Sequence, residues 1–380
     1  MLFWIIFFLL GVFIYIAAAI LDKSHTKSIA IVYTIFIWFI GAFRLNIGTD
    51  YSTYEVMYDS TTDFLSFEEG LEPTFTIISG LLNYCEFTSQ MLFVVYEAII
   101  IYFLYAGAQR YLPNQLCILL FMVLYAVFPT NGGYWWDLNA MRQAAAISVA
   151  FWSSGFFFEK KYAKFLLSFG LAVLFHYSAI VFIMLLPWGR KFSAKLVSIL
   201  LLLGFVFNYT GITSVVAMQI FAQIMELYGK YEMAIFSAVA GTASFSITAF
   251  YFAALYIGAV YYFGKQNLSV FVFNGASIYI LLRVYMSFGV ENSVFATVVH
   301  RFEVYYLPFF LIMLAMAMNN FVEKYRHNIK SVFAVSTLII SFVILSLNTV
   351  SNQDNDVLAK ISPGASGGNI EYEFNFDLFK

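Results

Sequence analysis

The sequence predicts an all-α, polytopic integral membrane protein with about 10–12 transmembrane helices, some of them short or re-entrant half-helices. Hydrophobic residues make up 62% of the 380 residues, and aromatic residues alone make up 21%. Charged residues make up only 11%, whereas a soluble domain has about 25%. Apolar stretches recur without a long polar linker. We therefore expect one membrane domain over residues 1–350 and an exposed C-terminal tail over residues 351–380.

The first two apolar stretches predict a helical hairpin. Leu2–Leu21 has no basic residue before it and is followed by Lys23 and Lys27. Cytoplasmic loops of membrane proteins are enriched in Lys and Arg, so we expect this span to be a retained anchor whose N-terminus lies outside. The second span, about Ser28–Phe43, then returns to the outer face.

The loop at residues 47–72 indicates the outer side of the membrane, because it contains seven acidic residues and no Lys or Arg. Basic clusters, which favour the cytoplasm, alternate with further expected outer loops at about residues 130–140, 210–245 and 289–302. The remaining apolar stretches predict helices at Pro73–Tyr84, Met91–Ala108, Leu116–Phe128, Leu196–Val206, Ile247–Phe263, Val270–Phe288, Val304–Met318 and Val332–Leu347.

The apolar stretch Phe165–Trp188 predicts a helix break. Basic clusters flank it at Lys160–Lys164 and at Arg190–Lys195, and both clusters favour the cytoplasm. A single crossing of about 20 residues would leave one cluster outside, so we expect two half-helices that turn near His176. Non-helical backbone at membrane depth is tolerated where it is buried in protein or lines a wet cavity. His176 is therefore a candidate general base, a hydrogen-bond donor to phosphate or a buried structural imidazole.

Four arginines are expected at the outer side of the membrane: Arg44, Arg142, Arg283 and Arg301. A guanidinium group keeps its charge at every relevant pH and binds phosphate oxygens through a planar fork of N–H donors, which a lysine lacks. The cytoplasmic clusters, in contrast, are mostly Lys. Together the arginines predict a phosphate-binding site, although pairing with loop carboxylates or lipid headgroups would explain any single one of them.

Further polar residues extend this candidate site. Asn139, Arg142 and Gln143 are spaced i, i+3 and i+4, which predicts that they share one face of a helix. Asp50 follows Arg44 by six residues and is a second candidate base.

Several functional classes lack support in the sequence. A net charge of −2 does not suit a nucleic-acid platform. There is no HExxH motif, Walker A loop or GxSxG elbow, and the four histidines do not form a metal-binding pattern. We therefore expect neither a metal nor a cofactor. One charge stays unexplained: Glu97 lies inside an apolar span, where a carboxylate is costly, and the sequence does not identify its partner.

Short motifs follow one another in the order Arg44, Gly48-Thr49-Asp50-Tyr51, Glu72-Pro73-Thr74-Phe75, Met141-Arg142-Gln143 and Phe175-His176-Tyr177-Ser178. This order resembles the EpsG family of Wzy-type bacterial polysaccharide polymerases. The resemblance implies a GT-C-like, metal-independent membrane glycosyltransferase. Such an enzyme joins O-antigen or exopolysaccharide repeat units at the outer face of the cytoplasmic membrane. Donor and acceptor are both carried on undecaprenyl pyrophosphate. The resemblance leaves open whether a chain-length regulator protein is a further partner.

Under this resemblance, the expected catalytic residues are His176, Asp50 and Arg142. The expected substrate-binding residues are Arg44, Tyr51, Asn139, Gln143, Arg283 and Arg301. Two alternatives from other classes are a flippase or transporter of lipid-linked oligosaccharides and a membrane acyltransferase that modifies a glycan. Transporters commonly contain inverted repeats, and none is visible in this sequence.

Overall fold

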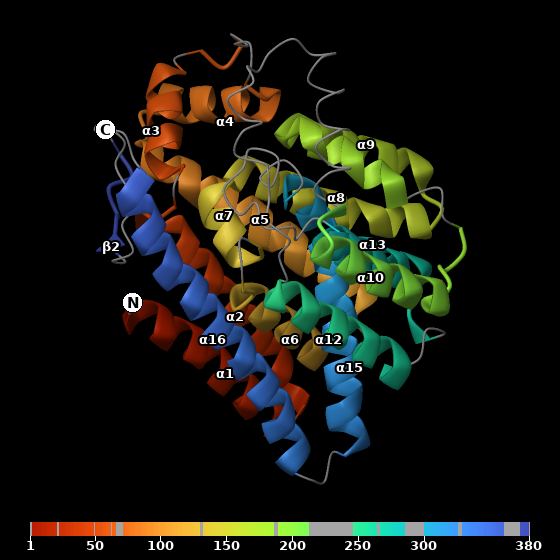
Figure 1. The fold of residues 1–380 in the computed structure, drawn as a ribbon. Helices are drawn as coiled ribbons and strands as arrows, with labels where there is room; N and C mark the ends of the chain where they lie inside the picture. The colour runs from red at the N-terminus through yellow and green to blue at the C-terminus, as the bar shows by residue number, and fades with distance from the viewer. Residues whose placement is uncertain are drawn as a thin grey trace. The chain divides into compact units, whose positions relative to one another are not determined.

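The computed structural model consists mainly of α-helices (Figure 1). It describes residues 2–20, 23–48, 50–61, 63–65, 71–129, 132–185, 189–212, 246–263, 267–285, 300–325, 329–360 and 373–379. Most of the expected outer loops at 210–245 and 289–302 lies outside these residues.

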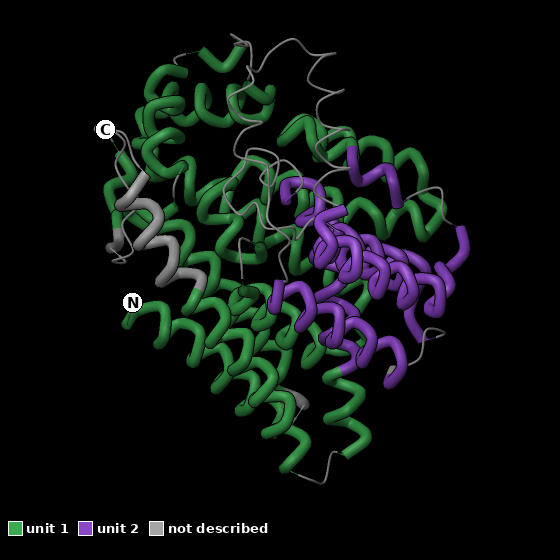
Figure 2. The backbone as a smooth tube through the Cα atoms, in the orientation of Figure 1, with its two compact units in different colours: residues 1–180, 318–380 green, residues 181–317 purple. Residues whose placement is uncertain are grey.

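The chain forms two compact units (Figure 2). Unit 1 comprises residues 1–180 and 318–380, and unit 2 comprises residues 181–317. Unit 1 contains α1 (Leu2–Ile20), α2 (Lys23–Ala42), β1 (Arg44–Leu45), α3 (Tyr51–Ser60), α4 (Pro73–Tyr84), α5 (Ser89–Tyr111), α6 (Gln115–Ala126), α7 (Tyr134–Asn139), α8 (Met141–Phe158), α9 (Tyr162–Phe175), α16 (Ile329–Lys360) and β2 (Glu373–Phe374). Unit 2 contains α10 (Ala194–Tyr209), α12 (Ile247–Phe263), α13 (Val270–Tyr285) and η4 (Val304–Tyr306), while η1 (Tyr177–Leu185) and α15 (Leu307–Lys324) run from one unit into the other.

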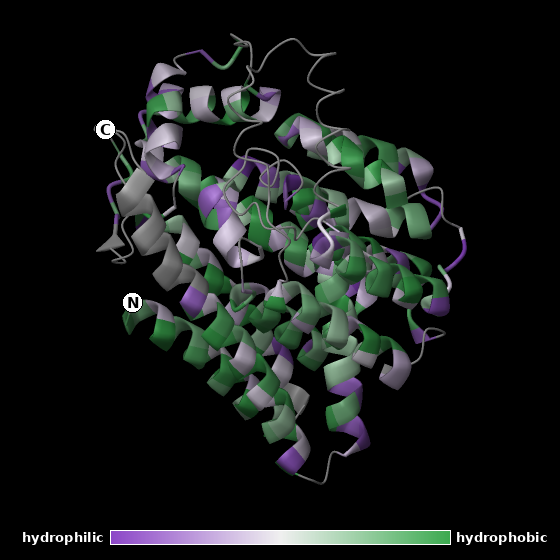
Figure 3. Cartoon of the chain, in the orientation of Figure 1, coloured by the Kyte–Doolittle hydropathy of each residue, from purple (hydrophilic) through white to green (hydrophobic). Residues whose placement is uncertain are grey.

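The helices confirm the predicted all-α, polytopic membrane fold. Among the described residues, five segments are long and apolar enough to span a membrane: Leu2–Ile20, His25–Ala42, Ser89–Tyr111, His300–Lys324 and Ile329–Asn348. Five shorter apolar helices accompany them. Helix α1 is hydrophobic along its whole length (Figure 3), and large apolar side chains on it, such as Phe13 at 63%, are exposed. Such a surface suits lipid rather than water.

Helix α8 packs against both α5 and α9 in unit 1. Its first turns carry Ala144, Ala145 and Ala146, all buried. Small side chains let neighbouring helices approach closely, which is how membrane helices pack in the absence of a hydrophobic driving force. The start of α8 is therefore held firmly by its neighbours.

Parts of the expected C-terminal tail form regular structure. Helix α16 continues as far as Lys360, and β2 pairs with β1 in antiparallel register, so that Arg44 faces Phe374. Beyond β2, the backbone N–H of Thr88 donates to the carbonyl of Leu378 at 3.0 Å. Backbone hydrogen bonds thus hold residues 373–379 against the rest of unit 1. An unpaired strand edge would leave its polar backbone groups without partners.

Candidate functional site

Arg142 is the second residue of α8 and follows a break in the helix. Helix α7 ends at Asn139, and Ala140 has non-helical dihedral angles of φ −114° and ψ 58°. The prediction that Asn139, Arg142 and Gln143 share one helical face is wrong, since a common face requires a continuous helix. Gln143 is buried, with 1% of its surface exposed, whereas the Arg142 side chain is 20% exposed.

One carboxylate and two aromatic rings surround the guanidinium group of Arg142. Its Nη1 donates to Oε2 of Glu72 in a close ion pair. The guanidinium carbon lies 5.7 Å from the ring centre of Tyr54 and 5.5 Å from that of Phe75, within the range of cation–π contacts. These contacts hold the guanidinium group in place, while 20% of the Arg142 side chain is exposed.

His176 lies at the predicted helix break, which the structure confirms. Helix α9 ends at Phe175, His176 has extended backbone angles of φ −160° and ψ 124°, and the 3₁₀ helix η1 follows. Nε2 of His176 lies 3.8 Å from Oε1 of Glu72. Nδ1 accepts a hydrogen bond from the backbone N–H of Ser178 at 3.2 Å and lies 2.9 Å from the Ser178 hydroxyl. The ring thus directs one nitrogen toward Glu72 and the other toward its own turn.

Glu72 joins two predicted site residues into one group, which we call the Glu72 cluster (Glu72, Arg142 and His176). The Glu72 side chain is 6% exposed, while those of Arg142 and His176 are 20% and 19% exposed. The Thr74 hydroxyl donates to the carbonyl of Leu174 at 2.8 Å, which ties the start of α4 to the end of α9. Glu72 is therefore the most buried member of the cluster, and Arg142 and His176 are its partly exposed members.

Glu72 is not among the site residues that the sequence predicts, although the sequence contains a signal for it. Glu72 is the last acidic residue of the loop at 47–72, and Pro73 follows it directly. Proline is favoured at the first position of a helix, and α4 indeed begins at Pro73. This position directly before a helix distinguishes Glu72 from the other acidic residues of the loop.

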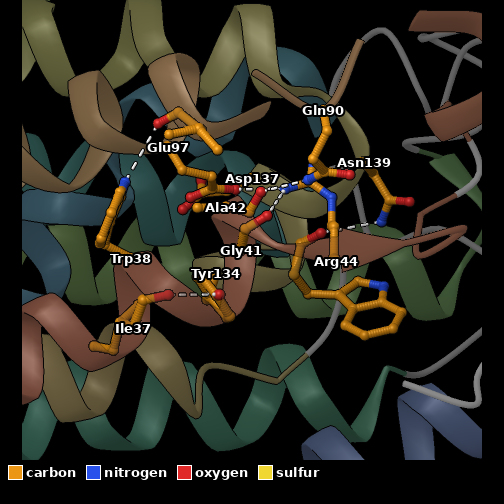
Figure 4. A network of polar contacts seen from close by, with 12 residues as sticks. Ile37, Trp38, Gly41, Ala42, Arg44, Gln90, Glu97, Tyr134, Asp137 and Asn139 are labelled. Carbon is orange, nitrogen blue, oxygen red and sulfur yellow. Dashed lines mark hydrogen bonds and ion pairs between the residues drawn. The ribbon is translucent and has the colours of Figure 1, made fainter. Parts of the chain in front are cut away.

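Arg44 is fully buried and pairs with Glu97, the intramembrane acid whose partner the sequence did not identify (Figure 4). Both side chains are 0% exposed, and Nη1 of Arg44 lies 2.8 Å from Oε1 of Glu97. The same nitrogen donates to the carbonyl of Gly41 at 2.7 Å, and the guanidinium carbon lies 4.7 Å from the ring centre of Phe93. This burial does not support the predicted role of Arg44 in substrate binding, because no part of its guanidinium group is accessible.

A glycine and a second acid complete this buried network. A Cβ atom on Gly41 would lie 2.5 Å from the carboxyl carbon of Glu97, so only glycine leaves room for the ion pair. Asp137, in α7, is 1% exposed and accepts a hydrogen bond from the Tyr125 hydroxyl at 2.5 Å. Burial and the nearby Glu97 carboxylate raise the pKa of Asp137 well above its ordinary value. Glu97, which contacts Arg44 directly, compensates the charge of that arginine.

The other predicted residues of unit 1 lie at its core or its edge. Tyr51 is 2% exposed, stacks on Phe93 with ring centres 4.4 Å apart and donates to Oε1 of Gln90 at 3.2 Å. Asp50 precedes α3 and is partly exposed. Nδ2 of Asn139 donates to the carbonyl of Trp135 at 3.0 Å. Tyr51 thus contributes to packing, while Asp50 remains accessible to solvent.

Unit 2 contains a second group of one arginine, one glutamate and one histidine. Nη1 of Arg283 lies 2.8 Å from Oε1 of Glu303, and Nδ1 of His300 lies 2.6 Å from the same oxygen. The Glu303 side chain is 2% exposed, while those of Arg283 and His300 are 18% and 15% exposed. Arg301, the fourth predicted arginine, is exposed. Of the two predicted arginines of this unit, Arg301 is thus exposed and Arg283 only partly so.

Comparisons with known proteins identify one family. The model of the EpsG family matches residues 27–360, which is most of the chain. No curated protein matches the chain, and no solved structure does so either.

Proposed function

Because the chain belongs to the EpsG family, we propose that it joins polysaccharide repeat units carried on undecaprenyl pyrophosphate, at the outer face of the bacterial cytoplasmic membrane. Membership of this family indicates a polysaccharide polymerase-type function. The proposal assigns the reaction to the Glu72 cluster. The observation that carries it is the partly exposed side chain of Arg142, whose guanidinium group is held in place by one carboxylate and two aromatic rings.

The charges at the two ends of α8 support an outer position for the cluster. Arg142 lies at the start of α8, and Lys160 and Lys161 follow its end. A helix of 18 residues is about 27 Å long, close to the hydrocarbon core of a bilayer at about 30 Å. Lysine clusters favour the cytoplasm, so Arg142 belongs to the opposite side. Helix α9 packs on α8 and runs back, which brings His176 to the Arg142 end.

Arg142 is suited to the pyrophosphate of the donor. Its charge is permanent, and its N–H fork matches phosphate oxygens. When the bond between the anomeric carbon and the pyrophosphate oxygen breaks, negative charge grows on that oxygen. A positioned cation then stabilises the transition state more than the ground state. A hydroxyl group of a second lipid-linked repeat unit attacks the same carbon. Arg283 and Arg301 in unit 2 are further candidates for contacts to substrate phosphates.

A row of exposed apolar residues on α9 supports a lipid-linked substrate. Leu167, Leu171 and Leu174 are spaced i, i+4 and i+7, which places them on one helical face, and they are 78%, 37% and 43% exposed. The row ends two residues before His176. A polyprenyl chain along this face would bring its pyrophosphate to the Glu72 cluster.

A strain that lacks the gene tests this function. We expect single repeat units linked to lipid to accumulate at the outer face, and the glycan ladder on a gel to disappear. An unchanged ladder would contradict the proposal. Accumulation at the cytoplasmic face would indicate a flippase, and a ladder of normal length without one modification would indicate an acyltransferase.

A further inference from the structure

The hydrogen bonds of His176 determine which ring nitrogen carries the proton. The backbone N–H of Ser178 can only donate, and it lies 3.2 Å from Nδ1, so Nδ1 is an acceptor without a hydrogen. In the neutral ring the hydrogen then sits on Nε2, the nitrogen 3.8 Å from Oε1 of Glu72. Neither nitrogen offers a lone pair to a substrate in this arrangement. His176 is therefore a hydrogen-bond donor and not the base that its position in the sequence suggested.

Glu72 is the proton acceptor that remains within the cluster. A carboxylate is a competent general base for a sugar hydroxyl or a water molecule, as inverting glycoside hydrolases demonstrate. Glu72 lies against both partly exposed members of the cluster, Arg142 and His176. Its Oε2 accepts a hydrogen bond from Arg142, so this oxygen is occupied as long as the ion pair persists.

From this geometry we propose that Glu72 is the general base of the reaction and that binding of the donor releases it from Arg142. The proposal rests on the polymerase function proposed above. A pyrophosphate carries more negative charge than one carboxylate and matches the guanidinium fork, so it competes with Glu72 for Arg142. Once Arg142 turns to the pyrophosphate, Oε2 of Glu72 loses its hydrogen-bond donor and can accept a proton from the acceptor hydroxyl. The base is thus active only when a donor is present.

The chemical step needs no reactant besides the donor and the acceptor. The acceptor hydroxyl transfers its proton to a carboxylate oxygen of Glu72 while its oxygen forms a bond with the anomeric carbon of the donor. The bond between that carbon and the pyrophosphate oxygen breaks, and its electron pair leaves with undecaprenyl pyrophosphate. Arg142 compensates the charge that develops on the leaving group, and Nε2–H of His176 is a donor to phosphate oxygen or to Glu72.

The variant Glu72→Gln tests this proposal, because the proposal predicts tighter binding of pyrophosphate together with slower polymerisation. The purified full-length variant should bind inorganic pyrophosphate several-fold more tightly than the wild type, since the competing carboxylate is gone. Its polymerisation rate on lipid-linked repeat units should fall about 10²–10⁴-fold, the usual contribution of a general base. A merely structural role for Glu72 would weaken both properties together, and that result would overturn the proposal.

Three further variants sharpen the test. Glu72→Asp keeps a carboxylate and should polymerise faster than Glu72→Gln. Asp50→Asn removes the rival base, so an inactive Asp50→Asn variant beside an active Glu72→Gln variant would overturn the assignment. Glu159→Gln is the matched control, because Glu159 also pairs with an arginine, Arg110, at 2.7 Å but at the exposed surface. It should change neither measurement.

The outcomes separate this inference from the function on which it rests. A wild-type protein without any polymerisation activity on lipid-linked repeat units would contradict the proposed function itself. An active wild type with an equally active Glu72→Gln variant would contradict only the role of Glu72. Gel filtration in detergent shows whether each variant is folded. If Glu72→Gln does not fold, Glu72→Asp is compared with the wild type instead.

Discussion

Cells in which Arg142 is replaced by alanine are expected to produce no long polymer. The substitution removes the cation that stabilises the departing pyrophosphate, and loss of one positioned donor of this kind costs about 10²–10³-fold in rate. It also leaves the carboxylate of Glu72, which is 6% exposed, without its cation. Glycan length on a gel, in a deletion strain that carries the variant gene, measures the effect.

Arg142→Lys should restore little of the lost polymer. A lysine keeps the charge but lacks the planar fork that binds two phosphate oxygens at once, and it does not stack on the rings of Tyr54 and Phe75 in the same way. Full restoration by lysine would show that charge alone is sufficient and would contradict bidentate binding.

Arg110→Ala is the matched control for this experiment. Arg110 also pairs with a glutamate, Glu159 at 2.7 Å, and lies over an aromatic ring, that of Phe156 at 3.9 Å. It lies at the end of α5, and its partner follows the end of α8, remote from Arg142 at the start of α8. The ladder should therefore remain intact. A full ladder from Arg142→Ala at normal protein levels would refute the role of Arg142.

The membrane explains why much of the fold could be predicted from the sequence. A spanning segment must satisfy its backbone hydrogen bonds within a helix, so apolar stretches translate directly into helices. The short stretch Pro73–Tyr84 is α4 with the same bounds. The break at His176 followed from the charges on both sides, because two cytoplasmic clusters require an even number of crossings between them.

The details of the site depended on features that the sequence pattern does not contain. The interruption at Ala140 is a matter of two backbone angles, and it removes the helical face that the spacing of Asn139 and Arg142 predicted. Arg44 and Glu97 are 53 residues apart. Each is conspicuous as a charge in an apolar span, yet only the packing of α2 against α5 shows that they compensate each other.

The clearest consequence of that pairing is a large loss of stability when one partner is removed. Arg44→Met leaves Glu97 as an uncompensated carboxylate at 0% exposure, and breaking a buried pair in this way costs about 3–5 kcal/mol in the free energy of unfolding. Glu97→Met should cost a similar amount, because it isolates the guanidinium group. Thermal unfolding of the purified variants in detergent, together with their levels in membranes, measures both effects.

The double variant Arg44→Met with Glu97→Met distinguishes a stabilising arginine from a substrate-binding one. Replacing both charges of a buried pair by apolar groups is often neutral or stabilising, so the double variant should be more stable than either single variant. If Arg44 acts only through the fold, the double variant should also recover the glycan ladder. A stable double variant that makes no polymer would instead indicate that Arg44 binds substrate. It would also imply that the guanidinium group of Arg44 leaves Glu97 when the donor binds.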